Sequence, residues 1–176
     1  MRTRTLLAVV GLGTAALLAG TAPTASAAPG DTTTTFALAG STLSVSVEST
    51  ATLSDGTSGA TSVSGSLGNV TVTDARGGTT PWSAKAASTT FTNGGTGAGL
   101  TESTAVTYNS GTVTTTGISV IGPKGAVALN ATAAEVVAPD SVVGNNTAQW
   151  NPTLTVTLPS SSLVGSYTGT ITTSVS

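Results

Sequence analysis

The chain has 176 residues, contains neither cysteine nor histidine, and has only 7% charged residues, with five basic against seven acidic side chains. This composition excludes disulfides, metal sites built from Cys or His, and catalytic triads that depend on His, and it provides no basic surface for nucleic acid. Thr and Ser, with 38 and 22 copies, are the main polar residues instead.

Residues 1–27 have the organisation of a secretory signal peptide. Arg2 and Arg4 precede an apolar stretch over 6–20, and Ala25-Ser26-Ala27 forms a small-residue cleavage site. The alternative is a permanent membrane anchor, for which the apolar stretch is short, since a span needs ~20 apolar residues. We therefore expect a secreted chain from Ala28 onward, without a membrane span, whose three basic and seven acidic side chains give a net charge of −4.

The remaining chain is predicted to be a flexible leader over 28–32 and a single domain over 33–176. A Ser/Thr-rich glycosylated stalk is the alternative, but such stalks lack regularly spaced apolar residues. Apolar residues alternate with Thr or Ser here, for example over 42–47 and 153–158. This period of two is typical of strands with one buried and one solvated face.

The pattern predicts an all-β fold after the signal peptide. The preferred architecture is an antiparallel two-sheet β-sandwich, immunoglobulin-like or jelly-roll-like, with a closed barrel as the alternative. Turn signals rich in Gly, Asn and Asp separate the strands, among them 139–140 and 144–146, and 93–103 is expected to be a glycine-rich surface loop. The predicted strands cover 33–39, 42–48, 66–73, 82–87, 104–108, 112–120, 126–137, 147–157 and 166–175.

Few large side chains are present to form the core. Trp82 and Trp150 are the expected central pair, because each shares the strand parity of neighbouring alanines. The other large core members are expected to be Phe36, Phe91, Tyr108 and Tyr167.

Three segments carry a family resemblance. The first contains Val72-Thr73-Asp74-Ala75-Arg76-Gly77 and leads to Trp82; the second is Trp150-Asn151-Pro152 after a pair of asparagines; the third is Gly165-Ser166-Tyr167-Thr168-Gly169. In this order they resemble the WxL-domain surface proteins of Gram-positive bacteria, in the variant found among secreted actinobacterial proteins, over about residues 35–175. The Trp-x-Leu motif itself is replaced here by Trp82-Ser83-Ala84.

The resemblance implies a β-sandwich that is secreted and faces the cell wall, attached non-covalently to peptidoglycan or another wall polymer, with other surface proteins as further possible partners. Candidate ligand-binding residues are Trp82, Trp150, Tyr167, Asp74 and Arg76. Each has a plainer interpretation. The tryptophans would be core residues, and Asp74 would cap a turn beside a surface Arg76.

No arrangement of residues points to catalysis. The acidic residues are scattered, whereas glycoside hydrolysis needs two carboxylates across a cleft, and calcium needs several oxygens converging. We therefore expect neither enzyme activity nor a metal or other cofactor. The functions considered are a wall-associated surface protein, a carbohydrate-binding module that uses the tryptophans, and a structural or adhesive subunit that associates through an uncharged strand edge.

Overall fold

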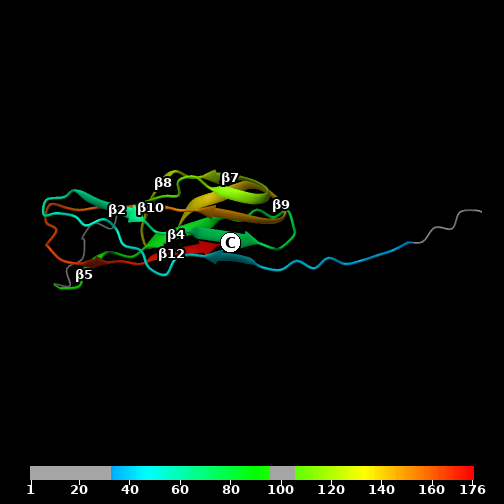
Figure 1. Ribbon diagram of the computed structural model, residues 1–176, viewed down its shortest axis with the longest axis horizontal. Coiled ribbons are helices and arrows are strands. Elements are labelled where there is room, and N and C mark those ends of the chain that lie inside the picture. Colours follow the sequence, from blue (N-terminus) through cyan, green and yellow to red (C-terminus); the bar gives the residue numbers. More distant parts are fainter. Residues whose placement is uncertain (1–32, 96–105) are drawn as a thin grey trace, which may run out of the picture. The chain divides into compact units, whose positions relative to one another are not determined.

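The computed structural model in Figure 1 describes residues 33–95 and 106–176. The predicted signal peptide and leader, and residues 96–103 of the predicted glycine-rich loop, lie outside the described residues. All strands belong to one compact unit that begins at Ala37. In the part of the chain that is described, no helix is long and apolar enough to cross a membrane.

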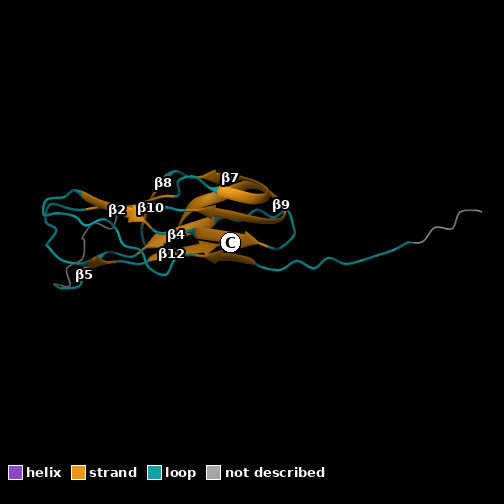
Figure 2. Ribbon diagram, in the orientation of Figure 1, coloured by secondary structure: helices purple, strands orange, loops and turns teal. Residues whose placement is uncertain are grey.

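The secondary-structure elements of the described residues are all strands, and these strands pair antiparallel (Figure 2). The predicted all-β, sandwich-like fold is therefore confirmed. The strands are β1 (Leu43–Ser46), β2 (Ser62–Ser66), β3 (Val70–Asp74), β4 (Ala84–Ser88), β5 (Thr92–Asn93), β6 (Val106–Asn109), β7 (Thr114–Pro123), β8 (Ala126–Leu129), β9 (Ala134–Trp150), β10 (Thr153–Thr157), β11 (Tyr167–Thr168) and β12 (Ile171–Val175).

The long strand β9 organises the larger sheet. Its residues 146–150 pair with β3, its residues 134–137 pair with β4, and β7 pairs with it over 137–149. The order of this sheet is β1-β3-β9-β4-β12, with β7 attached to β9. A second sheet has the order β2-β10-β6-β8, and β5 and β11 form a short third ladder.

Two neighbouring chain segments pass together from one sheet to the other. Val70 pairs with Trp150 in the larger sheet, while Ser66 pairs with Thr153 in the second sheet. Between these pairs the backbone N–H of Leu67 donates a 3.0 Å hydrogen bond to the carbonyl oxygen of Pro152. The change of sheet therefore divides each of the predicted strands 66–73 and 147–157 into two. In the first segment the break contains Gly68, whose φ is positive, a conformation that favours glycine.

The core follows the predicted alternation. On β3 and β10 the aliphatic residues point inward, and the intervening Thr residues are exposed or half-buried. Trp82 and Trp150 are each 2% exposed, which confirms them as core residues, and Tyr108 is fully buried. Phe91 and Tyr167 pack against the core but are only partly buried. The buried apolar residues are Val70, Val72, Trp82, Ala84, Ala86, Val106, Tyr108, Leu129, Val136, Val137, Val142, Ala148, Trp150, Leu154 and Val156.

The prediction was wrong for Phe36 and for the segment around it. No strand forms over 33–39, and Phe36 is 90% exposed instead of belonging to the core. The first backbone hydrogen bond after this segment runs from the N–H of Ser41 to the carbonyl oxygen of Ala75, at 2.8 Å. Alternation shows that a segment suits a strand, but a strand also needs a partner edge.

The predicted turns at 139–140 and 144–146 lie inside β9. Opposite them β7 continues, with register shifts between Thr116 and Ile118 and between Val120 and Ile121. Such bulges use the same Gly and Pro residues as turns, and they leave a few residues of the ladder unpaired while the strand continues. The bulge at Gly117 has φ of +85°, and a Cβ there would lie 2.7 Å from the backbone oxygen of Asn145, so this position requires glycine.

Candidate functional site

Asp74 and Arg76 form a bidentate ion pair. Asp74 ends β3 and is 3% exposed. Its Oδ1 accepts hydrogen bonds from the backbone N–H of Arg76 at 3.1 Å and from Nε at 2.9 Å, and its Oδ2 accepts one from a terminal guanidinium nitrogen at 3.0 Å. That same nitrogen donates to the oxygen of Thr80 at 2.8 Å. The turn-capping interpretation of Asp74 is therefore confirmed, and Arg76 helps to close the same turn.

Asn146 extends this pair into the core. It stands opposite Asp74 in the β3–β9 ladder and is 3% exposed. Its Nδ2 donates to Asp74 at 3.4 Å and to the oxygen of Gly144 at 3.1 Å, while its Oδ1 accepts the indole N–H of Trp82 at 3.1 Å. The side chains thus form one chain of hydrogen bonds, which we call the Asp74 network, from Arg76 through Asp74 and Asn146 to Trp82.

The electrostatics of the Asp74 network agree with its geometry. The side-chain hydrogen bond from Arg76 lowers the pKa of Asp74 below its usual value of 3.8, although burial acts in the opposite direction. The carboxylate in turn raises the pKa of Arg76. These side chains serve as hydrogen-bond partners for one another. The Asp74 network therefore stabilises the connection between β3 and β4.

Trp150 also has a buried hydrogen-bond partner for its indole N–H. Its indole N–H donates to the hydroxyl oxygen of Tyr108 at 2.8 Å, and both residues are buried. Burial raises the pKa of Tyr108 to about 12. Neither Trp82 nor Trp150 therefore has an exposed face on which a sugar ring could stack, and the core interpretation holds for both.

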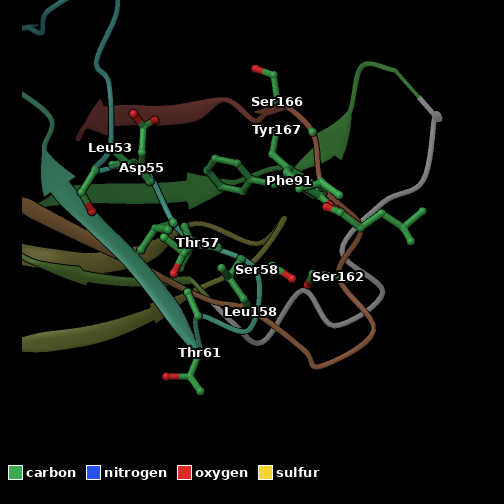
Figure 3. A pocket seen from close by; sticks show the side chains of 18 of the residues that line it. Leu53, Asp55, Thr57, Ser58, Thr61, Phe91, Leu158, Ser162, Ser166 and Tyr167 are labelled. Atoms are coloured by element: carbon green, nitrogen blue, oxygen red, sulfur yellow. The ribbon is translucent and has the colours of Figure 1, made fainter.

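Tyr167 is the one candidate residue that lines an open groove. It lies in β11, is partly buried, and donates its hydroxyl to the backbone oxygen of Leu163 at 2.9 Å. The groove has a volume of about 580 Å³ (Figure 3). Its walls are the connection over 51–61, the segment around Phe91, and residues 158–169, which follow β10.

Phe91 provides the second aromatic ring of this groove. In Figure 3 its ring points into the space between the segments that carry Asp55 and Tyr167. The ring packs on the backbone of Gly169, where a Cβ would lie 2.9 Å from the ring carbons. A smaller groove of about 380 Å³, which includes Glu48, meets the first at Phe91.

Polar groups accompany the two rings. The groove lining contains Asp55 and many hydroxyl groups, and one of these, the Oγ of Ser162, is buried and has no hydrogen-bond partner within the described residues. Aromatic rings with several hydroxyls and a carboxylate suit a ligand that presents both C–H and O–H groups. The labelled polar residues in Figure 3 are Asp55, Thr57, Ser58, Thr61, Ser162 and Ser166.

Sequence reasoning found only one residue of this groove. Tyr167 came from the resemblance, although it was also expected in the core, as was Phe91, and neither Asp55 nor Ser162 was a candidate ligand-binding residue. The candidate residues are not brought together, since Tyr167 lines the groove and Asp74, Arg76 and Trp82 form the Asp74 network. In the described residues, no group of three or more acidic side chains could hold a metal ion.

Comparison of the chain with protein-family models, with curated proteins and with solved structures found no match. The resemblance to WxL domains therefore stays a prediction.

Proposed function

We propose that this chain is a non-catalytic, secreted or cell-surface β-sandwich protein that binds a glycan of the bacterial cell wall. The observation that carries the proposal is the groove, which combines Phe91 and Tyr167 with Asp55 and a row of hydroxyls. Sugar rings pack their C–H faces on aromatic rings and exchange hydrogen bonds with hydroxyls and carboxylates. The predicted signal peptide supports the location, and the resemblance supports the wall as the partner.

The number of acidic side chains in the groove supports binding without catalysis. Asp55 is the one acidic side chain among the described residues that line the larger groove, and Glu48 lines the smaller groove that meets it at Phe91. Glycoside hydrolysis uses a pair of carboxylates, one on each side of the scissile bond. A single exposed carboxylate instead suits a hydrogen-bond acceptor for sugar hydroxyls, and each such charge-assisted bond contributes about 1.5–3 kcal/mol.

The proposal is tested by pull-down of the mature chain, residues 28–176, with purified peptidoglycan. Asp55→Asn should lower the affinity about tenfold, because it weakens one charge-assisted hydrogen bond. Asp140→Asn is the matched control, since Asp140 is an exposed carboxylate on β9 that does not line the groove. It should bind like the unmodified chain.

A second pair of variants separates the ring of Tyr167 from its hydroxyl. Tyr167→Phe keeps the ring and should retain most of the binding, whereas Tyr167→Ala should lose it. Far-ultraviolet circular dichroism of both variants shows whether the strands are intact. Equal binding by all these variants, or no enrichment of the unmodified chain over an unrelated β-domain, would overturn the proposal.

A further inference from the structure

Two exposed apolar side chains lie on the segment before the first strand. Phe36 and Leu38 are each 90% exposed, whereas large apolar side chains elsewhere are mostly buried or half-buried. They are two residues apart, so an extended chain presents both on one face. The segment 33–39 contains no charge, no proline and no glycine, which is the composition of a segment that readily adds to a sheet edge.

A second exposed apolar pair lies on the β7–β9 ribbon. Val120 is 60% exposed and Val143 is 51% exposed. The register pairs Ile118 with Val143 and Val120 with Ser141, so Val120 and Val143 are diagonal neighbours on the same face. Isolated exposed valines are common, but here Val120 lies on a strand whose outer edge is unpaired among the described strands.

The strand β7 is a long edge without charge, although two register shifts and Pro123 interrupt it. It is ten residues long and contains no charged side chain, and it pairs with β9 alone among the described strands. Edge strands of soluble proteins are usually short or carry charged residues, which prevent pairing with other chains. The first charge after β7 is Lys124, and it already forms a 3.0 Å ion pair with Glu135.

We infer that residues 33–39 of one copy add as a strand to the free edge of β7 in a second copy. Phe36 and Leu38 then lie beside Val120, on the part of β7 that follows the bulge at Gly117. Neither segment carries a charge, so the pairing opposes no like charges. Because the two surfaces differ, the contact is heterologous and joins copies into open chains. This inference concerns assembly and does not depend on glycan binding.

The connectivity favours a second copy over the same chain. Ser41 is bonded to Ala75, which follows β3, and the strand order β3-β9-β7 places the free edge of β7 about three strand spacings, or ~14 Å, from β3. Residues 39–41 span at most ~7 Å. Pairing of the whole segment with β7 of its own chain would therefore require Ser41 to leave Ala75.

Single-cysteine variants test the contact directly, because the chain contains no cysteine. Leu38→Cys and Val120→Cys, made separately and mixed under mild oxidation, should form a mixed disulfide several-fold more than a mixture of Leu38→Cys with Val47→Cys. Val47 is also exposed, but it lies beside the smaller groove. An equal yield in both mixtures, or preferential linkage to position 47, would overturn the inference.

Sedimentation of the mature chain gives a second readout. The unmodified chain should show association that increases with concentration, and Phe36→Thr with Leu38→Thr should abolish it. Both side chains are exposed, so the double variant should unfold at the same urea concentration as the unmodified chain. A chain that stays monomeric at millimolar concentration, or a double variant that associates as before, would contradict the inference.

Discussion

The indole N–H of Trp82 donates a 3.1 Å hydrogen bond to Oδ1 of Asn146, a residue 64 positions away. Asn146 also contacts Asp74, so the two sequence segments that contain the Asp-x-Arg and the Trp150 motifs meet in one buried network. Removing any one member would leave other buried polar groups without partners. The network therefore explains the spacing of these residues through stability, and ligand binding need not be invoked for them.

Asn146→Ala should lower the free energy of unfolding substantially. It leaves the Trp82 indole N–H without its acceptor, and an unsatisfied buried group costs about 1–3 kcal/mol. Urea unfolding followed by tryptophan fluorescence measures the change. Asn145→Ala alters the exposed neighbour and should stay within about 0.5 kcal/mol of the unmodified chain. Equal effects of the two substitutions would refute the role of the Asp74 network.

The ion pair between Asp74 and Arg76 should make the free energy of unfolding depend on pH in the acid range. The pKa of Asp74 is lower in the folded chain than in the unfolded chain, because Arg76 hydrogen-bonds the carboxylate. The unfolded chain then binds more protons below about pH 5, so this stabilisation is present at neutral pH and is lost as the pH falls through the folded-state pKa. The difference in unfolding free energy between the unmodified chain and Asp74→Asn should shrink below pH 4. A difference that stays constant from pH 7 to pH 2 would contradict this.

Tyr108 predicts a second dependence, at alkaline pH. Its pKa is about 12 in the folded chain, mainly because it is buried, against about 10 in an unfolded chain. Between these values the unfolded chain loses a proton that the folded chain retains, so stability should fall by about 1.4 kcal/mol per pH unit as the pH rises. Tyr108→Phe removes this proton, and it also removes the acceptor of the Trp150 indole.

Chemical denaturation of the unmodified chain and of Tyr108→Phe, from pH 7 to pH 11.5, measures how the free energy of unfolding depends on this ionisation. Tyr108→Phe should be less stable at pH 7 and should approach the unmodified chain above pH 10. Parallel curves over the whole range would show that the folded state ionises Tyr108 normally.

The bulge in β7 predicts a requirement for glycine. Gly117→Ala combines a left-handed backbone, which costs a non-glycine residue about 1–2 kcal/mol, with a clash against the oxygen of Asn145 at 2.7 Å. Gly59→Ala is the matched control, since Gly59 has the same φ of +85° and no neighbour within 4 Å. Thermal unfolding should rank Gly117→Ala as clearly the more destabilised. The opposite order would contradict the close approach of β7 and β9.

The sequence predicted those parts of the fold that depend on local pattern. Alternation identified β3 and β10 and placed Trp82 and Trp150 in the core, because the side-chain period of a strand is set by its backbone. It failed at Phe36, where a suitable strand segment has no partner edge, and within β9, where Gly144 lies in a bulge of a continuing strand instead of a turn. In both cases long-range pairing decided the outcome.

The candidate site was less predictable than the fold. The groove is assembled from connections that are distant in sequence, and Asp55 and Ser162 have no signal in their neighbourhood that distinguishes them from ordinary turn residues. Asp74 and Arg76 were noticed because their spacing is distinctive, but that spacing reflects a capped turn.

The central claim is that the groove around Phe91 and Tyr167 binds a wall glycan. It is tested most directly by titrating the ¹⁵N-labelled mature chain with soluble, uncrosslinked peptidoglycan fragments and recording amide chemical shifts. The account predicts saturable shifts for Asp55, Ser162 and Tyr167, with the amides of the Asp74 network unchanged. Shifts confined to residues outside the groove, or no shifts at millimolar fragment concentration, would contradict it.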